Sequence, residues 1–64
     1  MDKFDICVLI ENELNGSKNR VVVVSTPLAD EIATLLNGIY YVGRKNDTII
    51  VSCSEELTRE EMKK

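Results

Sequence analysis

The stretch that most constrains the fold covers residues 20–38 and reads RVVVVST, PLADEIATLLN and a final glycine. Four consecutive valines are typical of a strand that is covered on both faces. Thr26 can cap the helix that follows, and Pro27 suits a first helical position, because the N–H that it lacks would be unpaired there anyway. Gly38 fits the left-handed position just past a helix end. The stretch predicts a strand over 20–25 and a helix over 27–37.

The predicted helix has one apolar face. Asp30 and Glu31 lie early in it, where the helix dipole favours negative charge. The larger apolar residues recur at i, i+4, i+7 and i+8, and they are Leu28, Ile32, Leu35 and Leu36. A helix with a single apolar stripe has to bury it against another element, so we expect a sheet beneath it.

Three more runs rich in apolar residues predict strands, over 4–14, 39–44 and 48–53, with successive side chains on opposite faces. Asn15-Gly16 suits a tight turn, which would join the strand over 4–14 to the one over 20–25 as a hairpin. Asn46-Asp47 is a turn signal between the last two strands. Ser54 can cap a short helix in the tail.

These elements predict one α+β domain over residues 1–64 with the order ββαββ. In this domain one helix packs on one face of a four-stranded sheet, and a short C-terminal helix follows. The strands over 20–25 and 39–44 would be parallel and joined by a right-handed crossover. The order of the strands in the sheet stays open.

Size and charge limit the kinds of protein that the chain can be. It has 64 residues and a net charge of −3, from 8 basic and 11 acidic side chains. A domain this short buries only about 60% of its unfolded surface and usually needs a disulfide, a metal or a partner chain. The acidic balance disfavours binding to nucleic acid. The charged first residues and the short apolar run over 6–10 predict neither a signal peptide nor a membrane span, so we expect a cytoplasmic protein.

Residues that could carry chemistry are few. The chain has two cysteines, Cys7 and Cys53, and no histidine. Both cysteines fall in predicted strands, and we expect them to be buried core residues, since a free cysteine usually packs as a small hydrophobe. The carboxylate pairs are expected on the solvated surface. The sequence therefore predicts a protein that is not an enzyme, with no cofactor and no metal.

A single helix would cover only one face of the predicted sheet. The other face would carry an apolar patch larger than monomers usually expose, which predicts an interface with a second copy or with another protein. The residues expected to form this protein interface are Cys7, Leu9, Val22, Val24, Tyr40 and Tyr41.

The favoured interpretation is a small, non-enzymatic protein-interaction module. It would form a homodimer and bind another protein. In its strongest version it would also inhibit that protein, as an antagonist encoded by a phage or a mobile element does. The alternative is a domain that binds a small ligand or a nucleotide. It would stack the ligand on Tyr41 and hold a phosphate with Arg44 and Lys45.

Overall fold

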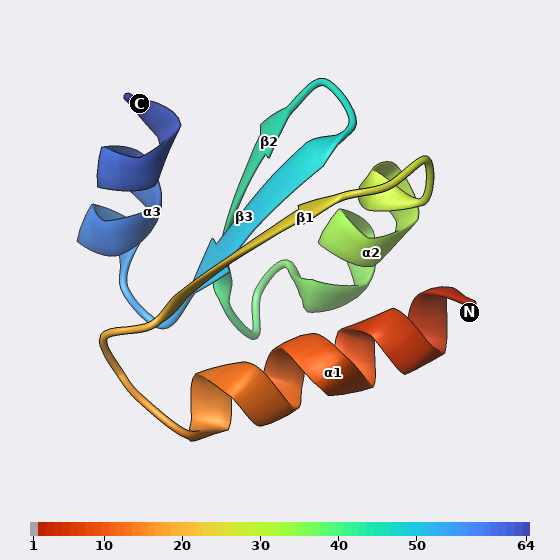
Figure 1. Cartoon of the computed structure of the whole chain (residues 1–64), viewed down its shortest axis with the longest axis horizontal. Helices are drawn as coiled ribbons and strands as arrows, with labels where there is room; N and C mark the ends of the chain where they lie inside the picture. The colour runs from red at the N-terminus through yellow and green to blue at the C-terminus, as the bar shows by residue number, and fades with distance from the viewer. Residues whose placement is uncertain (1) are drawn as a thin grey trace.

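The computed structural model describes residues 2–64, which form a three-stranded antiparallel sheet and three helices (Figure 1). The elements in chain order are α1 (Lys3–Asn15), β1 (Val21–Ser25), α2 (Ala29–Leu36), β2 (Tyr41–Lys45), β3 (Thr48–Ser52) and α3 (Glu55–Met62). The fold is α+β. However, the predicted four-stranded sheet with one helix packed on it is wrong.

The main correction concerns residues 4–14, which form most of α1 instead of a strand. The Asp2 carboxylate caps this helix by accepting a hydrogen bond from the Asp5 N–H over 3.0 Å. The buried residues Cys7, Ile10 and Leu14 follow the helical period. The helix ends at Asn15, so the predicted hairpin between residues 4–14 and 20–25 is also wrong.

The sheet has the strand order β1-β3-β2, and β3 pairs antiparallel with both neighbours. Strands β1 and β2 consequently run in the same direction, but β3 lies between them. The connection through α2 therefore joins the two edge strands of the sheet. A two-residue turn joins β2 to β3, as predicted, and Asn46 has a positive φ of 58° in it.

The helix predicted over 27–37 is present as the shorter α2, which begins two residues later than predicted. Its N-cap is Leu28, with no side-chain hydrogen bond, so the prediction that Thr26 caps the helix and that Pro27 is its first residue is wrong. The Thr26 hydroxyl accepts a hydrogen bond from the Leu28 N–H over 3.2 Å, in the turn that precedes the helix. Gly38 has a φ of 94°, the left-handed conformation expected just past the helix. The buried face differs from the predicted stripe, because Leu35 is 38% exposed.

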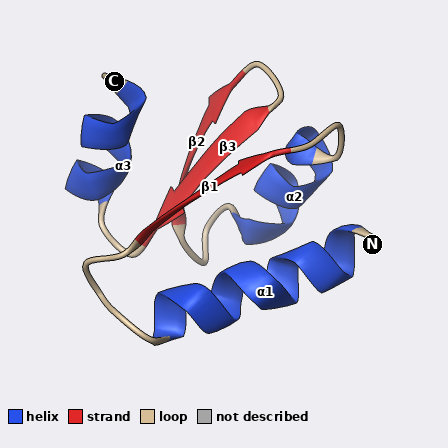
Figure 2. Cartoon of the chain, viewed as in Figure 1, coloured by secondary structure: helices blue, strands red, loops and turns tan. Residues whose placement is uncertain are grey.

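The sheet lies between two helical layers, with α1 and α2 on one face and α3 on the other (Figure 2). The core between the sheet and the first two helices consists of Cys7, Ile10, Leu14, Ala29, Ile32, Ala33, Leu36, Ile49 and Val51. Residues 49–52 of the central strand are all buried, since both faces of the strand are covered. The face that we expected to be open is thus partly covered by the tail helix.

Candidate functional site

Most of the residues predicted to form a protein interface lie inside the domain. Cys7 is in the core, and Val22, Val24 and Tyr40 pack against it. The two exposed members are Leu9, on α1, and Tyr41, on β2. The structure therefore does not bring the six residues together on one surface. The predicted shared surface requires residues 4–14 to be a strand, and these residues belong to α1 instead.

The residues of the alternative ligand site also lie apart. Successive side chains of a strand point to opposite faces. On β2, Arg44 faces α2, where its Nη1 lies 3.1 Å from Asp30 Oδ1. Tyr41 and Lys45 are on the α3 face, at opposite ends of the strand. The three side chains thus do not surround one ligand position.

The cysteines differ in exposure. Cys7 is buried, and its pKa is raised by burial and, to a lesser extent, by the Glu11 carboxylate. Its thiol stays protonated and is a poor nucleophile. Cys53 is exposed, and the prediction that it is buried is wrong, because β3 ends at Ser52.

Among residues 2–64, no cluster of three or more acidic or cysteine side chains could hold a metal ion. Within the same residues, no helix has the length and apolar character that crossing a membrane requires.

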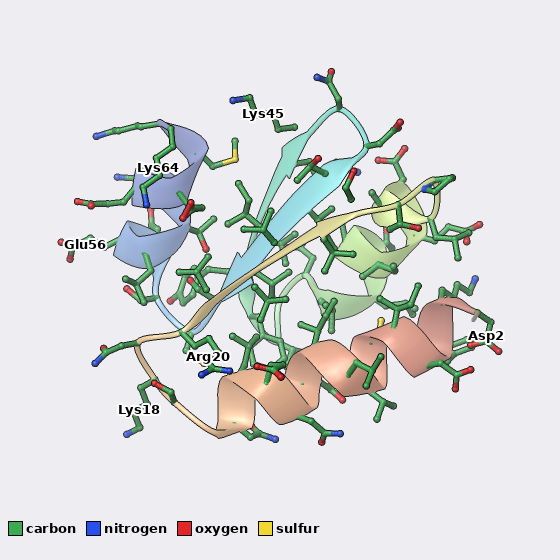
Figure 3. The ribbon with its side chains drawn as sticks, in the orientation of Figure 1. Asp2, Lys18, Arg20, Lys45, Glu56 and Lys64 are labelled. Atoms are coloured by element: carbon green, nitrogen blue, oxygen red, sulfur yellow. The ribbon has the colours of Figure 1, made fainter. Side chains whose placement is uncertain are left out.

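The feature that stands out is strand β2, which forms an edge of the sheet. One side of this strand pairs with β3. On the other side, no strand among residues 2–64 pairs with its backbone N–H and C=O groups. Lys45 ends the strand beside the hairpin turn (Figure 3). This edge is flanked by a hollow on each face of the sheet.

The larger hollow is a groove of about 580 Å3 between β2 and α3. Its apolar lining includes Ile39, which is 65% exposed, the exposed Tyr41 and the half-buried Met62. Glu55 and Arg59 of α3 also line it, and they form an ion pair with each other. The charges on this side are thus already matched, while the apolar side chains are left partly open to solvent.

Gly43 sets how closely α3 approaches the sheet. A Cβ atom added there would lie 2.7 Å from Met62 Sδ and 3.1 Å from Thr58 Cγ2, so no larger residue fits without a shift. The sequence predicts only that this glycine lies in the strand over 39–44. Its structural role could not be recognised without knowing that the tail helix docks on β2.

The smaller hollow, of about 180 Å3, lies on the other face, between β2 and α2. It is lined by Ala33, Thr34, Asn37, Val42 and Arg44. Three of its lining residues, Thr34, Asn37 and Arg44, have polar side chains that can donate hydrogen bonds. This hollow is therefore more polar than the groove on the α3 face.

The two hollows meet at the β2 edge, because Asn37 and Val42 line both of them. A chain that pairs with the free side of β2 would extend the sheet. Its successive side chains would point alternately into the groove beside α3 and into the hollow beside α2. The arrangement has the two elements of strand-addition sites, which are a free backbone edge and pockets for alternate side chains.

Comparison with known proteins identifies no relative. No protein-family model matches the chain, and neither a curated protein nor a solved structure matches it. Function is therefore inferred from the geometry of the described residues.

Proposed function

We propose that this protein is a non-enzymatic interaction module that binds an extended segment of another protein along β2. The observation that carries the proposal is the position of this edge strand between two hollows, one on each face of the sheet. In strand addition, backbone hydrogen bonds supply affinity and pockets for alternate side chains supply selectivity. The β2 edge offers both.

The charges of β2 favour a foreign strand over a second copy of β2. Arg44 and Lys45 are adjacent on the strand, and both are exposed. Antiparallel pairing of two β2 strands over residues 41–45 would set Arg44 opposite Val42 and Lys45 opposite Tyr41, so neither cation would gain an opposite charge from the second copy. Basic residues on an edge strand are a common protection against self-pairing.

We place the proposed homodimer contact on α1 instead. Phe4, Val8 and Leu9 are large apolar residues on this helix, and each remains at least half exposed. Antiparallel packing of two α1 helices would cover them and bring the acidic end of each helix, at Glu11 and Glu13, near the positive N-terminal end of the other. In sedimentation analysis, we expect Val8→Glu to convert the dimer to a monomer of 7.2 kDa. A wild-type protein that stays monomeric at high concentration would contradict this contact.

The proposal also includes a location in the cell and an effect on the partner. A cytosolic location is supported by the exposed free thiol of Cys53, since a reducing compartment keeps such thiols unpaired. Inhibition of the bound partner stays a prediction. Binding at β2 inhibits the partner only if the partner needs the bound segment for its own activity.

Strand addition is tested with selected peptides as the probe. A random-peptide phage library is selected on the immobilised protein, and the enriched peptides are synthesised. We expect their addition to shift the amide resonances of β2, and we expect binding to be lost when amides on one edge of the peptide are N-methylated. N-methylation on the opposite edge, at alternate residues, should be tolerated. The proposal would be overturned if the selection enriches no peptide. It would also be overturned if N-methylation disturbs binding on neither edge of the peptide.

A further inference from the structure

We infer that the segment bound at β2 carries an apolar side chain for the groove beside α3 and a carboxylate for the hollow beside α2. This inference rests on the proposed function, and it specifies the chemistry of the partner. It follows from the different linings of the two hollows and from the alternation of side chains along a strand.

The groove beside α3 selects an apolar side chain. Its volume of about 580 Å3 leaves room for a large residue. Ile39, Tyr41 and Met62 present apolar atoms that a bound side chain would remove from water. Arg59 and Glu55 form an exposed pair of opposite charges, so together they give the groove no net charge. A charged side chain here would lose hydration beside a lining that favours neither sign of charge.

The hollow beside α2 selects a carboxylate. Its volume of about 180 Å3 suits a short side chain. The Arg44 guanidinium has five N–H donors, and its hydrogen bond to Asp30 uses one of them. Asp30 is 85% exposed, so this surface ion pair is weak and leaves Arg44 available. An arriving carboxylate would accept a charge-assisted hydrogen bond from Arg44, whereas a basic side chain would be repelled.

The strand geometry also fixes the spacing of the two side chains. Val42 and Arg44 share the α2 face, while Tyr41 and Gly43 share the α3 face. Residues of an added strand reach opposite faces only when their positions differ by an odd number. The apolar and acidic residues of the partner segment are therefore adjacent or three positions apart, and not two.

Lys45 adds to the attraction for an acidic segment. Among residues 2–64 it forms no ion pair, in contrast to Arg44 and Arg59. It ends β2 next to Arg44, so the hairpin end of the edge carries two adjacent positive charges within a protein whose net charge is −3. An acidic partner is thus attracted to this edge locally, even though the whole chain would repel it weakly.

The test repeats the peptide selection on the wild type, on Arg44→Glu and on Lys18→Glu. Lys18 is an exposed residue of the α1–β1 loop, so its reversal makes the same change in net charge away from the site. We expect wild-type peptides to pair an apolar and an acidic residue at odd spacing. Arg44→Glu should weaken their binding about tenfold or more and change the selected acidic residue to a basic one. Lys18→Glu should change neither.

Circular dichroism checks that each variant folds, and Arg44→Gln provides a neutral second variant that should weaken the same peptides less than Arg44→Glu does. Peptides that bind at β2 without an acidic residue, or at even spacing, would overturn this inference and leave strand addition standing. Peptides whose affinity is unchanged by Arg44→Glu would likewise overturn this inference and leave strand addition standing. If no peptide binds at β2, the proposed function fails, and this inference fails with it.

Discussion

The Thr58 hydroxyl lies 2.7 Å from the Ser52 hydroxyl and donates a hydrogen bond to the Tyr41 carbonyl over 2.9 Å. One side chain of α3 is thus attached to both β2 and β3. The Ser52 hydroxyl also accepts a hydrogen bond from the Ser54 N–H over 3.2 Å, at the start of α3. Ser52 and Thr58 are both buried, so this polar network fixes the helix that forms one wall of the groove.

Replacing Thr58 by valine should destabilise the protein by about 1–3 kcal/mol, because the Tyr41 carbonyl loses its hydrogen bond from Thr58 and the buried Ser52 hydroxyl loses a partner. Urea unfolding measures the change. Thr34→Val is the matched control, since the Thr34 hydroxyl bonds only to the Asp30 carbonyl of its own helix and is exposed. The control should stay within about 0.5 kcal/mol. Equal stabilities of the two variants would show that the network does not hold α3.

Gly43→Ala should destabilise the protein by about 1–3 kcal/mol, the usual cost of overpacking. The added methyl group would lie 2.7 Å from Met62 Sδ, and Thr58 Cγ2 is 3.1 Å away on a side chain fixed by hydrogen bonds. Met62→Ala should recover part of the loss in the double variant, which a double-mutant cycle measures. Gly43→Ala at or above wild-type stability would mean that α3 does not approach β2 this closely.

Two substitutions in α2 distinguish its observed core face from the predicted stripe. Ile32 is fully buried, and Ile32→Ala should cost about 2–5 kcal/mol. That is a large part of the roughly 3–10 kcal/mol expected for a domain of this length. Leu35 is partly exposed, so Leu35→Ala should cost clearly less, about 1 kcal/mol. Thermal melts followed by circular dichroism measure both, and a larger cost at Leu35 would contradict the orientation of α2.

Stability should fall as the solution becomes alkaline. The pKa values of Cys7 and Tyr40 are both raised above their ordinary values of 9.0 and 10.0, in each case mainly by burial. Below those values both groups are neutral in the folded and unfolded chains. At higher pH the unfolded chain ionises them first, so stability is lost as pH rises through the folded pKa values.

Urea unfolding between about pH 8 and pH 11 measures this loss. Cys7→Ala and Tyr40→Phe should each flatten the pH dependence relative to the wild type. An unchanged slope in both variants would contradict the burial of these two side chains. At neutral pH a maleimide should label Cys53 rapidly and Cys7 slowly. Rapid labelling of both would contradict the burial of Cys7.

Local signals in the sequence were sufficient for part of the fold. Thr26 and Gly38 mark the ends of the segment that contains α2, and Asn46-Asp47 marks the β2–β3 hairpin. The residues of α1 carry an ambiguous pattern. Six of the seven residues over 4–10 are apolar, so they satisfy both the period of a strand and that of a helix. The Asp2 cap and the helix length resolve the ambiguity in favour of α1.

The candidate site was less accessible to sequence reasoning, because it depends on contacts between distant residues. The position of β2 at the edge follows from β3 pairing between β1 and β2, which no turn length specifies. The sequence predicts only a short helix for the tail that contains Met62, whereas this side chain packs over Gly43. Tyr41 and Arg44 were recognised as candidates, but their opposite faces became clear only once the register of β2 was known.

The most direct test of the central claim is an isotope-filtered nuclear Overhauser experiment on the protein bound to a selected peptide. Strand addition predicts a regular series of contacts between the peptide backbone and the backbone of residues 41–45. It also predicts contacts from alternate peptide side chains to Met62 on one face and to Ala33 on the other. Contacts confined to α1, or to the opposite edge strand β1, would contradict the account.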